Sequence, residues 1–74
     1  MAKGSIGMIT RITGPVVDIR FPKLELPDIY HALTVTNNGK IFTLEVLQHL
    51  GAEDVRCISM QPTDGMSRGM TAVD

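Results

Sequence analysis

The sequence contains few of the residues that usually carry chemistry or mark an unusual environment. Its one cysteine, Cys57, cannot close a disulfide within the chain, so a reduced, intracellular setting is the simpler interpretation. Tryptophan is absent, and the aromatic residues are two phenylalanines and one tyrosine. Platforms for single-stranded nucleic acid usually need exposed aromatic rings beside positive charge. The basic residues here are scattered and the net charge is −1, so the sequence does not favour nucleic-acid binding.

The chain also lacks a long apolar run. No stretch approaches the roughly 20 residues of a membrane-spanning helix, so we expect no direct insertion into a membrane. The opening residues, MAKGSIGM, have neither the apolar core of a secretory signal nor the arginines of a transit peptide. These features agree with the intracellular setting that the single cysteine suggests.

The overall composition is typical of a small folded domain. Hydrophobic residues make up 43% of the chain and charged residues 20%, which argues against a disordered tail. The 74 residues allow one domain, which we assign to residues 1–74. A domain of this size buries only about 60% of the surface of its unfolded chain, so we expect a thin margin of stability.

The clearest local pattern is TVTNNGKIFTLEV, residues 34–46, in which apolar and polar residues alternate around Asn38-Gly39. A two-residue turn of the mirror-image type needs positive φ at both central positions, and Asn-Gly is the favoured pair. This spacing predicts a β-hairpin in which Val35 faces Phe42. Every second residue shares a face. One face therefore belongs to the core and carries Leu33, Val35, Phe42, Leu44 and Val46.

The opposite face of this hairpin carries Thr34, Thr43 and Glu45, which we expect at the surface. A slip of one residue would turn the apolar set toward water, so the alternation specifies the register strongly. A helix over residues 41–50 is the alternative interpretation, but the quality of the alternation favours strands.

A second hairpin is predicted nearer the N-terminus. Residues 5–13 form its first strand, and the pattern places four side chains on one face: Ile6, Met8, Thr10 and Ile12. Gly14 and Pro15 mark the turn. The second strand, residues 16–21, alternates so that Val17, Ile19 and Phe21 share the core face.

The remaining segments predict a loop and two further strands. Residues 22–28 contain two prolines and form a surface loop, anchored to the core by Leu24, Leu26 and Ile29. Residues 55–60 form a strand whose inward face stays open, because Val55 and Cys57 compete with Ile58 and Met60. Turn-forming residues follow, with Asp64, Gly65 and Gly69 at the turns, and residues 70–73 form a final short strand.

These strands predict an all-β fold, a small closed six-stranded antiparallel barrel. Closing the sheet removes the unpaired edges that an open sheet of this size would expose.

No group of residues has the spacing of a catalytic, cofactor-binding or metal site. His31 and His49 lie on different strands or at strand ends, so a metal or acid–base role is the less favoured alternative to an ordinary histidine. Cys57 is most simply a small core residue, with a reactive thiol as the alternative. The glycines do not form a phosphate-binding loop of the G-x-x-x-x-G-K-[ST] type.

Four segments in order, ITRITGPVVDIRFP, LPDIYHALTV, LEVLQHLGAEDVRCISM and TDGMSRG, closely resemble the N-terminal barrel of the beta subunit of F-type rotary ATP synthases. The resemblance runs from about Gly7 to Val73. The motif from Asp64 to Gly69 is shared with the sister alpha subunit, whereas IYHAL and EVLQHLG favour beta. The resemblance implies a six-stranded barrel in the crown of an alternating alpha–beta hexamer, with alpha subunits on either side.

The same resemblance implies that this chain is not itself an enzyme. In that family the P-loop, the catalytic glutamate and the residues that contact adenine lie further along the chain, so MgATP or MgADP would bind the parent subunit outside residues 1–74. The family also implies a peripheral complex on the cytoplasmic side of the bacterial inner membrane, in which ion-driven rotation is coupled to ATP synthesis. Two alternatives remain, a free-standing oligonucleotide-binding barrel and the barrel of a flagellar or vacuolar-type hexameric ATPase.

Overall fold

The computed structural model describes residues 4–74 as a closed barrel of six antiparallel strands. The strands are β1 (Ile6–Thr13), β2 (Val16–Arg20), β3 (Ala32–Asn37), β4 (Lys40–His49), β5 (Asp54–Ser59) and β6 (Thr71–Val73). The predicted fold class is confirmed. None of these residues lies in a helix that is long and apolar enough to cross a membrane.

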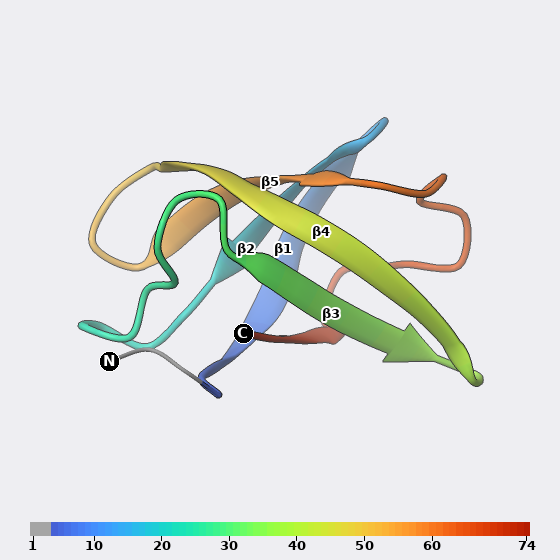
Figure 1. Cartoon of the computed structure of the whole chain (residues 1–74), viewed down its shortest axis with the longest axis horizontal. Helices are drawn as coiled ribbons and strands as arrows, with labels where there is room; N and C mark the ends of the chain where they lie inside the picture. Colours follow the sequence, from blue (N-terminus) through green and yellow to red (C-terminus); the bar gives the residue numbers. More distant parts are fainter. Residues whose placement is uncertain (1–3) are drawn as a thin grey trace.

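Around the barrel the strands follow the order β1-β2-β5-β4-β3-β6, and β6 pairs with both β1 and β3 to close the circle. In Figure 1, β3 and β4 pass in front, and the fainter β1 and β2 lie behind them. Three of the pairs, β1–β2, β3–β4 and β4–β5, join strands that are consecutive in the sequence. The pair β2–β5 joins strands that are far apart in the sequence.

The hairpin of β3 and β4 has the predicted register. Leu33 pairs with Leu44, and Val35 pairs with Phe42. At the tip, φ is +52° for Asn38 and +79° for Gly39, as the mirror-image turn requires. The alternative of a helix over residues 41–50 is wrong, because β4 occupies this segment.

The barrel interior is a continuous apolar core. All eight side chains that the alternation assigned to the core are buried: Val17, Ile19, Phe21, Leu33, Val35, Phe42, Leu44 and Val46. They pack with further buried residues: Ile9, Val55, Cys57, Met66 and Ala72. The face of β5, which the sequence left open, is therefore decided in favour of Val55 and Cys57.

The prediction that four side chains of β1 share one face is correct for Ile6, Met8 and Thr10 and wrong for Ile12. Ile6 and Met8 point outward and are 56% and 53% exposed, whereas Gly7 and Ile9 point inward. A bulge between Ile9 and Arg11 shifts the alternation by one residue, so that Ile12 packs against the core again. The bulge thus leaves Ile6, Met8 and Thr10 on the outer face and turns Ile12 toward the core.

Gly7 shows why β1 takes this phase. A Cβ atom at this position would lie 2.8 Å from the carbonyl oxygen of Arg20 and 2.9 Å from the ring of Phe21. The Phe21 ring fills the interior beside β1, so only a glycine fits between it and the strand. The larger side chains on either side of Gly7 must therefore face outward.

The loop predicted over residues 22–28 extends to residue 31 in the structure, and its predicted anchors are largely wrong. Leu24 is 90% exposed and Ile29 is also exposed, so of the three expected anchors only Leu26 packs against the core. The amide of Glu25 donates to the carbonyl of Pro22, which makes a tight turn with Leu24 at φ +70°. The turn directs the Leu24 side chain away from the barrel, and the fully buried residue of this loop is Pro27.

The predicted turns lie at strand connections. Gly14 and Pro15 form the two-residue turn between β1 and β2. Two successive turns precede β6, and they are closed by the hydrogen bonds from Met66 N to Thr63 O and from Met70 N to Ser67 O. Gly65 and Gly69 occupy these turns with φ of +97° and +91°.

The hairpin tip makes a specific prediction for Gly39→Val. A Cβ atom there meets no other atom within 4 Å, so any cost comes from the positive φ alone. We expect the substitution to lower the free energy of unfolding by about 1 kcal/mol or more, measured by urea denaturation. Gly51→Val is the matched control, because Gly51 is equally open but lies outside the positive-φ region. Equal effects of the two substitutions would contradict the strained turn.

The core makes a second prediction, for Phe42. This side chain is fully buried, whereas its neighbour Thr43 points to the outer face and is only half-buried. Phe42→Ala should lower the free energy of unfolding by about 3–5 kcal/mol, which is comparable to the whole stability of so small a domain. Thr43→Ala should change it by less than about 0.5 kcal/mol. Similar losses in the two denaturation curves would rule out the face assignment.

Candidate functional site

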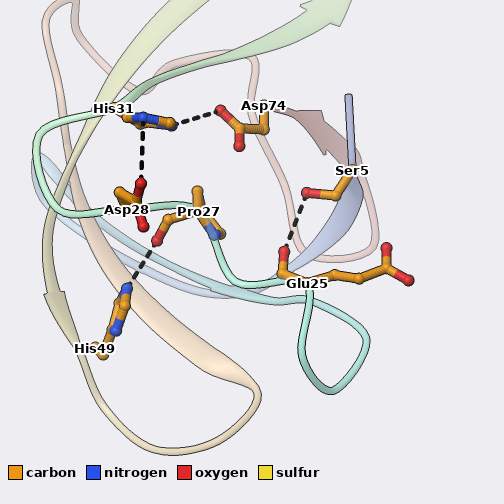
Figure 2. Close-up of polar contacts among 7 residues, drawn as sticks. All are labelled: Ser5, Glu25, Pro27, Asp28, His31, His49 and Asp74. Carbon is orange, nitrogen blue, oxygen red and sulfur yellow. Dashed lines mark hydrogen bonds and ion pairs between the residues drawn. The ribbon is translucent and has the colours of Figure 1, made fainter. Parts of the chain in front are cut away.

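The two histidines lie at the same end of the barrel but do not converge on a common point. His31 Nδ1 lies 3.1 Å from Asp74 Oδ1, and its Nε2 lies 3.7 Å from Asp28 Oδ2. His49 Nε2 lies 2.7 Å from the carbonyl oxygen of Pro27. Each ring is thus used in a separate contact, as Figure 2 shows. Within residues 4–74, no three His, Cys, Asp or Glu side chains form a group that could hold a metal ion.

These contacts fasten the loop of residues 22–31 across the end of the barrel. The Ser5 hydroxyl donates to the carbonyl of Glu25 at 3.1 Å (Figure 2). The amide of Tyr30 donates to the carbonyl of Val46 at 2.7 Å, beside the contact that His49 makes with Pro27. The loop is therefore held by Ser5 just before β1, by β4 and by the buried ring of Pro27, which gives it a defined position without a regular strand.

Asp74 joins the end of β6 to the start of β3. Its side chain is only 6% exposed, and Oδ1 contacts the imidazole of His31. Its backbone amide donates to the carbonyl of Ser5 at 3.0 Å. These contacts tie the last described residue to two strands. Among the described residues 4–74, the ion pairs of this cluster join only Asp28, His31 and Asp74, and they link segments at the barrel end.

The outer surface of β2 and β5 carries two cross-strand ion pairs. Arg56 donates to both carboxylate oxygens of Asp18 at 3.0 and 3.2 Å, and Arg20 does the same to Asp54 at 3.1 and 3.3 Å. In each pair the hydrogen bond and charge of the aspartate raise the pKa of the arginine. Because these groups satisfy one another, this surface offers little free charge for a ligand.

Cys57 has the environment of a structural residue. Its side chain is fully buried between the strands. Burial, with a smaller contribution from the nearby charge of Asp18, raises the pKa of the thiol to about 12. The thiolate is the reactive form of cysteine. The reactive-thiol alternative is therefore not supported.

Apart from the exposed apolar residues of the connecting loops, such as Leu24 and Tyr30, the apolar side chains on the outside of the barrel lie at two places. The first, which we name the β1–β6 patch, consists of Ile6, Met8 and Val73, and Ile6 is the direct cross-strand partner of Val73. It borders a groove of about 490 Å³ that extends to Arg20 and Glu53. The second, which we name the β4–β5 patch, consists of Met60, which follows β5, and of Ile41 and Leu47 on the outward face of β4, with Thr43 and Glu45 between them. Exposed apolar groups of this kind are typical of protein–protein contacts.

A comparison with protein families identifies the barrel. Residues 9–74 match the model described as the ATP synthase alpha/beta family, beta-barrel domain. The chain belongs to the ATP synthase alpha/beta family. The match covers all six strands except the first part of β1, and the closed six-stranded barrel agrees with the description of the domain. In this family the barrel is a structural domain, and membership implies hexameric assembly with related subunits.

The two apolar patches are the candidate functional surfaces of this alpha/beta barrel, and sequence reasoning did not identify them. The β1–β6 patch was missed because the bulge in β1 was not foreseen. A signal did exist for the other patch: Ile41 and Leu47 are large apolar residues in the phase of β4 that also carries Thr43 and Glu45. Large apolar residues that form a contiguous group on an outward face mark a candidate contact surface.

The environment of Cys57 predicts a specific pH dependence of stability. Between pH 9.0 and about 12 the thiol keeps its proton in the folded barrel but loses it in the unfolded chain. The unfolded state then binds fewer protons, so the free energy of unfolding falls as pH rises through this window, with no contribution below it. Urea denaturation over this range measures the effect. Cys57→Ala is the control, because it should remove this part of the slope.

Labelling with a thiol reagent at mildly alkaline pH gives an independent check. Cys57 should react only when urea is added. Reaction at the same rate in the folded barrel would contradict the buried, protonated thiol.

Proposed function

We propose that this barrel is the N-terminal crown domain of the beta subunit of an F-type rotary ATP synthase, where it holds the alternating alpha–beta hexamer together. The observation that carries the proposal is the family match over residues 9–74 to a β-barrel domain that the structure closes completely. Residues 1–74 then form a single domain, and its partners are the alpha subunits on either side.

The assignment to beta rather than alpha rests on two segments of the sequence. IYHAL and EVLQHLG are similar to the beta subunit, and they correspond to residues 29–33 and 45–51. Each segment contains one of the histidines of the barrel end, His31 and His49, which contact Asp74 and Pro27. The segments that favour beta thus include residues that give the loop of residues 22–31 its position.

A closed barrel suits a domain that must keep its shape. Every strand has a partner on both sides, although β6 pairs with β3 at Thr34 alone, so the barrel leaves few backbone groups to exchange hydrogen bonds with a neighbour. Contacts to other subunits are then made mainly by outward side chains, including those of the two apolar patches. A rigid collar of such barrels would hold the subunits at one end of the hexamer while the rest of each subunit changes conformation.

The catalytic activity belongs to the parent subunit. Nucleotide phosphates are usually bound by loop amides at a helix N-terminus, with a lysine nearby. The part of the chain that the structure describes contains no helix. We therefore assign MgATP and MgADP, and the synthesis of ATP from ADP and phosphate driven by ion flow, to the parent outside residues 1–74. The complex would lie on the cytoplasmic side of the bacterial inner membrane, attached to its ion-conducting part.

Two measurements test this function. The 74-residue chain should give no heat of binding in a calorimetric titration with MgATP and no phosphate release over time, because it lacks a phosphate-binding site. Deletion of residues 1–74 from the parent subunit should prevent assembly of the hexamer, which size-exclusion chromatography of the co-expressed subunits measures. Steady turnover by the chain would exclude the non-catalytic assignment, and a normal hexamer formed without the barrel would exclude the assembly role.

A further inference from the structure

The tip of the β3–β4 hairpin presents an asparagine followed by a glycine at the surface. Asn38 and Gly39 are the two residues between the strands, and both are exposed. Their φ values of +52° and +79° define the tight turn. The space beside Gly39 is open, since a Cβ atom there would meet no other atom within 4 Å. The side chain of Asn38 and the backbone of Gly39 are therefore accessible to each other and to water.

The two groups at the tip that can react with each other have no other contact. Among the described residues, neither the side-chain amide of Asn38 nor the backbone N–H of Gly39 makes a hydrogen bond. The neighbouring Asn37 differs in every respect. It is half-buried, its Nδ2 donates to the carbonyl of Gly65 at 2.8 Å, and the residue after it is not a glycine. Only one of the two adjacent asparagines thus has an unengaged amide beside an unshielded backbone nitrogen.

Asparagine is one of the chemically labile residues of proteins. From the exposure and the free groups of the tip, we propose that Asn38 is a site of spontaneous modification. The backbone nitrogen of Gly39 attacks Cγ of the Asn38 side chain, the bond from Cγ to Nδ2 breaks, and ammonia leaves with the amide proton. The product is a cyclic succinimide. Glycine suits this step, because it has no side chain to shield its nitrogen and its backbone rotates freely.

Water then opens the succinimide in one of two ways. Cleavage of the bond between the ring nitrogen and Cγ gives aspartate, with an ordinary main chain. Cleavage of the bond between the ring nitrogen and the former backbone carbonyl carbon gives isoaspartate, whose main chain runs through Cβ and is longer by one atom. Both products carry a carboxylate in place of the neutral amide, so the barrel gains a negative charge at the hairpin tip.

The two products have different effects on the hairpin. Asp-Gly is also a favoured pair for a turn of this type, so the aspartate form keeps the turn. The longer main chain of isoaspartate does not fit a two-residue turn. Asn37 and Lys40 pair directly at the base of the turn, and the turn sets the register of the strands. The isoaspartate form therefore loses this pair and weakens the hydrogen bond from Asn37 to Gly65.

Incubation of the 74-residue chain at mildly alkaline pH, folded and in urea, tests the proposed site. Peptide mass spectrometry locates the asparagine that gains a carboxylate, and isotopically labelled water marks the oxygen taken up when the ring opens. Asn38 should convert in the folded chain, while Asn37 stays unchanged. An unchanged Asn38 in the folded barrel, over the time in which the chain in urea converts it, would overturn the proposal. Equal conversion of both asparagines would do the same.

Gly39→Ala tests the role of the glycine nitrogen. Its rate of conversion is compared with that of the native chain in urea, so the result does not depend on folding. We expect conversion to slow about tenfold or more, because a Cβ atom hinders the approach and restricts the backbone. An unchanged rate would exclude attack by this nitrogen.

The effect on the hairpin is tested with the separated products. Chromatography isolates the isoaspartate form, and urea denaturation gives its midpoint. Asn38→Asp is the matched control, because it has the same charge and an ordinary main chain. The control should have a midpoint close to that of the native chain, and the isoaspartate form should have a lower one. Equal midpoints of the isoaspartate form and the control would contradict the distortion of the turn.

Discussion

The structure depends on a three-residue strand. β6 pairs with β1 through Ile6, Gly7 and Met8 and reaches β3 through Thr34, and these pairings close the barrel. Without β6, both β1 and β3 would expose unpaired backbone groups, and the buried Ala72 would no longer cover the interior. The flanking contacts reinforce this short strand, since Ile9 is hydrogen-bonded to Met70 before it and His31 to Asp74 after it.

Closure also explains why the barrel suits a role in assembly. A closed sheet satisfies its own backbone, so partners meet only side chains, and the strength of a contact depends on a few outward residues. The charged groups on the outer surface of β2 and β5 pair with one another, and the thiol of Cys57 is buried and protonated. The outward side chains that remain available for contact are mainly apolar groups and charged groups without an ion-pair partner among the described residues. Such groups suit recognition of another protein better than chemistry on a small molecule.

The two ends of the closed barrel differ in structure. One end is covered by the loop of residues 22–31, which carries no regular strand and is held by the contacts of Ser5, His49 and Pro27. The other end contains the tight turn at Asn38-Gly39 and the turns around Gly65. Both ends are thus covered by loops and turns, and the regular strands run between them.

The sequence by itself determined the hairpin of β3 and β4, the inward residues of β2, the turns and the closed all-β class. In these parts strict alternation and Asn-Gly or Gly-Pro pairs leave only one arrangement that buries the apolar side chains. The tertiary structure decided the rest. The face of β1 depends on the Phe21 ring beside Gly7 and on a bulge, and the face of β5 depends on its two neighbours. The positions of Leu24 and of both apolar patches likewise follow from contacts between distant segments, which no local pattern records.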